Sequence, residues 1–195
     1  MSVLNLYRVT DTLARLLAFN VRLLMPQGGI PSDVDVTTTR PELVTGEQPR
    51  LNLHLYHAAE THYHAKVPGL GAGTPTFTPQ PLALALSYVV TAHHDVDGSP
   101  SAREEQLLLG LAMKTLHDYP MIDDSLTIPA TDGTPQAVMP DDLVGGDNRF
   151  DITLQPVAAE DAVAFWAAEQ KSTVQLAAYY EVRTVVFDAE AGPDG

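Results

Sequence analysis

One segment constrains the fold of this chain more than any other. Residues 82–91 read LALALSYVVT and follow Pro81. Because neighbouring side chains of a strand point to opposite faces, this segment presents largely apolar residues on both faces. The segment therefore predicts a strand in the middle of a sheet that is covered on both sides.

Other segments predict the remaining strands. Residues 51–57 alternate strictly between apolar and polar, residues 150–154 alternate again before Pro156, and a short strand is possible at 34–38. A long closing strand is expected over 176–187. Its side chains should divide between two faces, with Ala178, Tyr180, Val182 and Val186 on one and Tyr179, Val185 and Phe187 on the other.

Residues 4–24 have the periodicity of an amphipathic helix. One side of it is apolar and consists of Leu6, Val9, Leu13, Leu16 and Leu17. The other side is expected to carry Arg8, Asp11, Thr12 and Arg15. The sequence PQGG at 26–29 predicts the end of this helix.

A second helix is predicted after Ser101. Ser101 and Glu104 have the spacing of a capping box, in which each side chain bonds to a backbone N–H of the other residue. The broad apolar face that follows consists of Leu108, Leu109, Ala112, Met113 and Leu116. Gly110 costs this helix about 1 kcal/mol relative to alanine, which predicts close packing at that position. Pro120 ends the helix.

A third, shorter helix is predicted over residues 160–169. Val163, Trp166 and Ala167 are expected to point inward. Trp166 is the only tryptophan, and core packing is its expected role, with an exposed interface anchor as the alternative.

The predicted elements follow the order αββαβαβ. This order predicts a single α/β (α+β) domain over residues 1–188, with a central mixed β-sheet flanked by helices. Residues 189–195 are expected to form a disordered tail. Two stretches without periodicity, 57–81 and 121–149, are expected to be long loops, the second with one helical turn near 139–143.

Composition excludes several classes of function. The chain has no cysteine, so disulfides, thiolate metal sites and cysteine nucleophiles are absent. It has 25 acidic against 11 basic residues and a formal net charge of −14. A surface this negative repels phosphates and anionic lipids, so neither nucleic acid nor a membrane is an expected partner. The acidity either keeps the protein soluble or complements a basic partner. No targeting segment or membrane span is recognisable, and we expect a cytoplasmic protein.

Histidines are the first candidates for a chemical site. His62 and His64 lie two apart in an extended segment and share a side, and a zinc site there needs a further ligand such as Glu60. Polarity of a solvent-facing loop is the simpler interpretation. His54 and His57 lie three apart in a predicted strand, so they are expected on opposite faces.

The remaining polar clusters lack the pattern of a catalytic site. His93 and His94, followed by Asp95 and Asp97, are expected to form a polar turn. Three acidic pairs are expected in loops or at helix starts: Asp123 with Asp124, Asp141 with Asp142, and Glu160 with Asp161. The run GLGAG at 69–73 precedes Thr-Pro-Thr and no helix, so it is not a phosphate-binding loop. We expect no catalytic, metal-binding or cofactor-binding residue.

Six segments together resemble one known family. They are residues 49–56 (PRLNLHLY), 81–92 (PLALALSYVVTA), 106–120 (QLLLGLAMKTLHDYP), 152–154 (ITL), 160–166 (EDAVAFW) and 178–186 (AYYEVRTVV). In order and spacing they are similar to the N-terminal domain of the cap, or tail-terminator, protein of contractile injection systems. The loops at 57–81 and 121–149 do not share in the likeness.

The resemblance implies a structural cap and not an enzyme. Such a cap is a hexameric ring that terminates the distal end of an inner tube and its sheath, so its partners are copies of itself and the tube and sheath proteins. It carries out no reaction and supplies no catalytic residues. Two alternatives stay open: a metal-dependent hydrolase that uses His62 and His64, and an assembly chaperone or ligand-binding module.

Overall fold

A six-stranded sheet organises the part of the chain that the computed structural model describes. That part comprises residues 6–24, 34–41, 44, 48–61, 82–96, 99–130, 132–141, 143–144, 149–168 and 175–187, with backbone alone at 82, 95–96, 99–100 and 184–187. The strands lie in the order β1 (Asp35–Thr37), β2 (Arg50–Glu60), β3 (Leu82–His93), β10 (Ala177–Phe187), β9 (Phe150–Gln155) and β6 (Met121–Ile122). β1 runs parallel to β2, and the other neighbours in the sheet are antiparallel. The predicted mixed sheet is confirmed.

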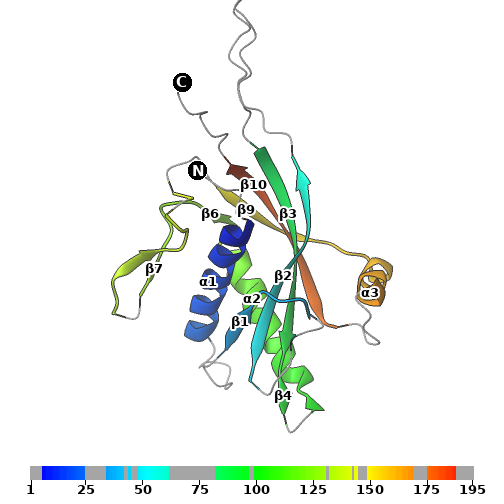
Figure 1. Cartoon of the computed structure of the whole chain (residues 1–195). Coiled ribbons are helices and arrows are strands. Elements are labelled where there is room, and N and C mark those ends of the chain that lie inside the picture. The colour runs from blue at the N-terminus through cyan, green and yellow to red at the C-terminus, as the bar shows by residue number, and fades with distance from the viewer. Residues whose placement is uncertain are drawn as a thin grey trace, which may run out of the picture.

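Helices cover both faces of the sheet (Figure 1). α1 (Leu6–Leu24) and α2 (Ala102–Asp118) lie side by side against one face, and α3 (Ala159–Ala168) lies against the other. Two small hairpins add to these elements: β4 (Asp95–Val96) pairs with β5 (Ser99–Pro100), and β7 (Thr127–Pro129) pairs with β8 (Pro135–Ala137). The arrangement confirms the α+β class. No helix within the described ranges is long and apolar enough to cross a membrane.

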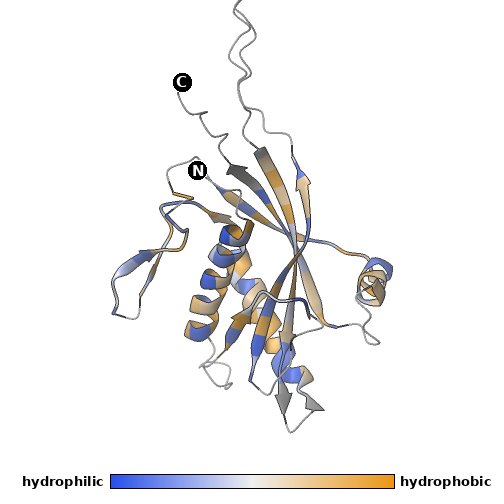
Figure 2. Cartoon of the chain, viewed as in Figure 1, coloured by the Kyte–Doolittle hydropathy of each residue, from blue (hydrophilic) through white to orange (hydrophobic). Residues whose placement is uncertain are grey.

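The main core lies between the sheet and the layer formed by α1 and α2. β3 contributes five side chains to it, which are Leu84, Leu86, Tyr88, Val90 and Ala92. Val89 points to the opposite face, where it packs with Trp166 and Tyr179 beneath α3. Figure 2 shows the apolar residues of α1, α2 and the strands gathered along the line where helices and sheet meet. The predicted cover on both faces of β3 is confirmed.

A buried hydrogen bond joins α1 to the central strand. The hydroxyl oxygens of Thr10 and Tyr88 lie 2.9 Å apart. Burial raises the pKa of the Tyr88 hydroxyl, although the bond to Thr10 lowers it in part. Thr12 is fully buried too, so its predicted place on the polar side of α1 is wrong. The reason is that α1 packs against the sheet, α2 and the β7–β8 hairpin, and Thr12 satisfies its hydroxyl by donating to the Arg8 carbonyl oxygen at 2.8 Å.

The start of α2 differs from the predicted capping box. The Ser101 side chain makes no capping hydrogen bond, and the Ser101 N–H donates to the His94 carbonyl oxygen at 2.8 Å. The Glu104 carboxylate lies against the His94 ring, with Oε2 at 2.5 Å from Nδ1. The capping box is therefore wrong, because His94, which follows β3, supplies other partners to both residues. The buried face of α2 is as predicted and includes Leu108, Leu109, Ala112 and Leu116.

α3 docks through an aromatic side only. Trp166 is 1% exposed, which confirms its expected role in the core. The Phe165 ring lies edge-on to the Tyr56 ring, with 5.3 Å between centroids. Val163 is 52% exposed and Ala167 is exposed as well, so their predicted inward orientation is wrong. Ala162 and Phe165 pack beside Trp166 instead, so the side of α3 that faces the sheet differs from the predicted one.

Both predicted loops contain strand residues. β2 continues to Glu60, and 121–149 includes β6, β7 and β8. Near 139–143, where a helical turn is predicted, the Leu143 N–H donates to the Pro140 carbonyl oxygen at 2.9 Å and the Val144 N–H to the Asp141 carbonyl oxygen at 3.3 Å, so the described residues form a turn that does not extend into a regular helix. These strands are two or three residues long and lack alternation, so only their neighbours in the fold define them.

The first half of β10 has the predicted faces. Ala178, Tyr180 and Val182 belong to the main core, and Tyr179 belongs to the cluster under α3. The register shifts between Arg183 and the residue two positions later. The predictions that fall outside the described side chains are the faces of Val185, Val186 and Phe187, and the tail at 189–195.

Gly110 lies on the exposed side of α2. Nothing in the described structure lies within 4 Å of the position that a Cβ atom would take there. The close packing predicted from its cost to the helix is therefore wrong for the protein by itself. Gly133 differs, because its φ of +83° lies in the left-handed region that side chains rarely adopt.

We predict that Gly110→Ala raises the free energy of unfolding by about 1 kcal/mol, the difference in helix propensity between the two residues. Urea denaturation of the purified protein measures this change. Gly133→Ala serves as the matched control and should lower stability, because alanine is strained at that φ. A loss of stability on Gly110→Ala would contradict the open environment of this residue.

Candidate assembly surfaces

The candidate zinc ligands are only partly covered by the structure. His62 and His64 lie outside the described residues, and Glu60 is the exposed last residue of β2. Within the described ranges, no three His, Asp or Glu side chains are grouped so that they could hold a metal ion.

His54 and His57 lie on the same face of the sheet. In the register of β2 and β3, His54 is opposite Val89 and His57 is opposite Ser87. Val89 and Ser87 are two residues apart, so they share the face that α3 covers in part. The predicted opposite orientation is wrong, because a β-bulge between Leu55 and His57 adds a residue to β2.

His94 is a structural anchor and not part of a polar surface turn. The residue is 8% exposed, and its backbone N–H donates to the Glu105 carboxylate at 3.4 Å. Together with the contact between its ring and Glu104, this bond ties the end of β3 to the first turn of α2. The neighbouring His93 ring bonds to the Thr91 hydroxyl at 2.8 Å. The polar-turn interpretation is therefore wrong for His94.

The acidic pairs within the described residues have local roles. Asp123 accepts hydrogen bonds from the Ser125 hydroxyl at 2.5 Å and the Ser125 N–H at 2.9 Å, and these bonds lower the pKa of its carboxyl. Glu160 and Asp161 lie in the first turn of α3, as predicted. The predicted features that lie outside the described residues are Asp97, Asp142 and the glycine run at 69–73.

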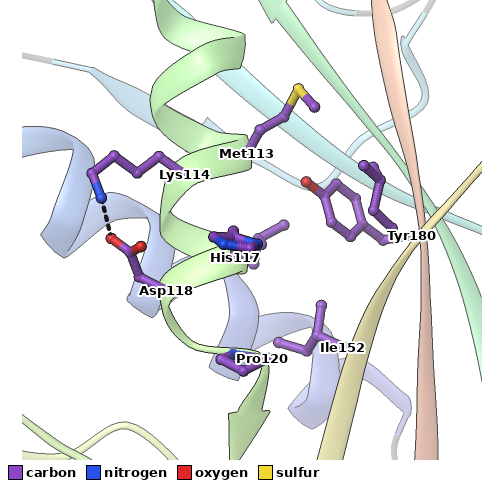
Figure 3. A pocket seen from close by; sticks show the side chains of 9 residues that line it. Met113, Lys114, His117, Asp118, Pro120, Ile152 and Tyr180 are labelled. Atoms are coloured by element: carbon purple, nitrogen blue, oxygen red, sulfur yellow. Dashed lines mark hydrogen bonds and ion pairs between the residues drawn. The ribbon is translucent and has the colours of Figure 1, made fainter.

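An apolar groove lies between the second half of α2 and the strands β9 and β10 (Figure 3). Its volume is about 380 Å³, and it is lined by Met113, Lys114, Leu116, His117, Asp118, Pro120, Ile152, Leu154 and Tyr180. We call it the α2–β9 groove. Met113 projects from α2 on the side of Tyr180, while Lys114 and Asp118 form an ion pair of 2.6 Å at the rim.

The Tyr180 hydroxyl at this groove differs from the Tyr88 hydroxyl in the core. Tyr180 is 4% exposed, and burial raises its pKa to about 12. Tyr88 bonds to Thr10, whereas no hydrogen-bond partner for the Tyr180 hydroxyl exists among the described residues. In Figure 3 this hydroxyl points toward α2 across the groove. Sequence alternation predicted the buried face of Tyr180 but could not show that its hydroxyl lacks a partner.

A second pair of depressions lies between α1 and the β7–β8 hairpin. Their volumes are about 390 and 540 Å³, and both are lined by Arg15, Gln136 and Ala137. Arg8 borders one and Arg22 the other, so three arginines at a spacing of seven residues follow this side of α1. Arg15 is paired with Asp11 at 2.8 Å. Shallow surfaces of this kind, with apolar walls and a few charges, suit contacts with another protein.

Comparison with known proteins places the chain in a family. A sequence model of the Pvc16 N-terminal domain matches residues 8–195. The chain belongs to this family. The resemblance to contractile-injection cap proteins predicted from the six segments is thereby confirmed. Comparison with curated proteins gave no match.

A solved structure shares the fold of this Pvc16 N-terminal domain. It is a cryo-EM structure of an extracellular contractile injection system, the PVC sheath/tube terminator in its extended state. The two chains are 13% identical with a TM-score of 0.55, and the match covers 96% of this chain and 58% of that chain. This chain therefore spans 58% of the length of that terminator. At such low identity the likeness concerns the fold alone.

The raised pKa of Tyr180 generates a prediction for alkaline pH. An unfolded tyrosine ionises near pH 10, whereas Tyr180 in the folded protein ionises at about 12. Its contribution to stability is thus complete below pH 10 and is lost as the pH rises toward 12. Urea unfolding at a series of alkaline pH values should show stability falling over this range, and Tyr180→Phe should reduce the slope. An unchanged slope in the variant would contradict the assignment.

Proposed function

We propose that this protein is a structural terminator of the sheath and tube of a contractile injection system. The observation that carries the proposal is the family match over residues 8–195. It is supported by the shared fold with a sheath/tube terminator across 96% of this chain. On this proposal the protein catalyses no reaction, and its partners are tube and sheath proteins. No described residue favours a hydrolase.

A polymer built from stacked rings needs a separate protein to end its growth. A stack of identical rings presents the same binding face after each addition, so its growth has no intrinsic end. A protein that occupies this face without offering it again stops the growth. The main core between the sheet and the layer of α1 and α2 suits that task, because it holds the shallow surface grooves in place for contacts with other proteins.

The proposal extends to assembly and charge. Six copies form a closed ring through head-to-tail contacts, in which one surface of each copy meets a different surface of the next. The net charge of −14 favours basic surfaces on the tube or sheath and speeds docking to them. Assembly takes place in the cytoplasm.

Deletion of the gene should leave few intact extended particles, with free tubes, uncapped sheaths or particles of aberrant length instead. Replacing Leu84, Leu86 and Val90 by aspartate should give the same result, because buried charges in β3 unfold the core. His62→Ala with His64→Ala is the control and should leave particles normal. Electron microscopy of lysates measures all three. Particles of normal number and length in the deletion strain would refute the terminator role.

The proposed ring predicts the symmetry of the particle end. Averaged images of the end that carries this protein should show sixfold symmetry in the density assigned to it. Light scattering of the free protein does not measure this, because the tube can template the ring. Density of a symmetry other than sixfold or threefold would contradict the proposed hexamer.

A further inference from the structure

The edge strand β6 covers only part of β9. Its two residues, Met121 and Ile122, pair with Asp151 and Phe150. One more hydrogen bond follows, from the Ile152 N–H to the carbonyl oxygen of Pro120 at 2.7 Å. Beyond Ile152, none of the described residues pairs with this side of β9.

Leu154 therefore presents free backbone groups at an open edge. The N–H and C=O groups of successive strand residues point to alternate sides, so those of Leu154 point to the same side as those of Ile152. No described residue bonds to them. The Leu154 side chain is 50% exposed and lines the α2–β9 groove. An open edge with unpaired backbone groups is a template for an added strand.

Three features thus meet at one place. The open edge at Leu154 adjoins an apolar groove, and Leu154 lies directly opposite Tyr180 in the register of β9 and β10. The Tyr180 ring is largely buried, and its hydroxyl faces the groove, open to solvent and without a protein partner in the described structure. Until a partner binds, water can bond to this hydroxyl, and a polar group of a bound segment can take the place of that water.

We propose that this edge and groove bind an extended, basic segment of a tube or sheath protein, an inference that rests on the proposed function. Only another extended backbone can pair with both the N–H and the C=O of Leu154. One apolar side chain of the segment fills the groove between Met113 and Ile152, and a backbone or polar group of the segment bonds to the Tyr180 hydroxyl. Pairing of this kind adds a strand to the sheet in line with β6.

The charge of the chain selects the partner. At the rim of the groove Asp118 is paired with Lys114 at 2.6 Å, and Glu160 and Asp161 follow β9 along the chain, in the first turn of α3. A second copy of this chain carries the same net charge of −14 and gains no electrostatic attraction to this site. A segment with lysine or arginine on both sides of its apolar residue is attracted instead.

The test uses a photoreactive benzoyl-phenylalanine in place of His117, an exposed residue at the rim, so that the edge and Tyr180 stay intact. Particles purified from producing cells are irradiated, and the adducts are identified by mass spectrometry. We expect an adduct with one basic segment of a tube or sheath protein. The same photoreactive group at Val163, which is 52% exposed on the opposite face, should not give this adduct.

Two substitutions sharpen the test. Tyr180→Phe removes only a hydroxyl that has no partner in the described structure, so folding should be kept while the adduct yield falls about fivefold, the worth of one hydrogen bond. Leu154→Pro removes the outward N–H, which an edge strand tolerates, and should abolish the adduct. An adduct with a second copy, no adduct in particles that contain the protein, or a yield unchanged by Tyr180→Phe would overturn the inference. Absence of the protein from purified particles would instead refute the proposed function.

Discussion

Burial of β3 on both faces is the constraint on which the rest of the structure depends. A strand with apolar residues on each side exposes them to water unless two separate layers cover it. α1 and α2 form one layer over Leu84, Leu86 and Val90, and α3 forms the other over Val89. This burial also removes the Tyr88 hydroxyl from water, and the hydrogen bond with Thr10 gives that hydroxyl a partner. The division of the helices between two layers follows from this one strand.

Sequence periodicity predicted the helices and strands whose apolar and polar residues recur at a regular spacing. The strands β3 and β9, the helices α1 and α2 and the faces of Tyr179 and Tyr180 are of this kind. The errors arose where a distant segment decides the outcome. A bulge in β2 reversed the orientation of His57 relative to His54, and His94 supplied the partners that replace the capping box at Ser101.

The candidate surfaces were less predictable than the fold. The α2–β9 groove combines residues from α2, the turn at Pro120, β9 and β10, and no local pattern brings those segments together. The sequence predicted that Tyr180 is buried, because alternation is a local property. Whether its hydroxyl has a partner depends on the residues that lie near it in space. The alternation of a single segment carries no information about those residues. The proposed function came from the resemblance to a family, because that resemblance compares the order and spacing of segments along nearly the whole chain.

The narrow attachment of α3 has a consequence for motion. Its contact with the sheet is a small aromatic group in which Trp166 is the only fully buried helix residue, whereas α1 and α2 share the main core. Local opening costs less where few apolar side chains leave their packing. The free energy that detaches α3 is therefore smaller than the free energy that unfolds the sheet. The face of β3 that carries Val89 can be uncovered while the main core stays folded, and hydrogen exchange under native conditions would register α3 as a separate unit of opening.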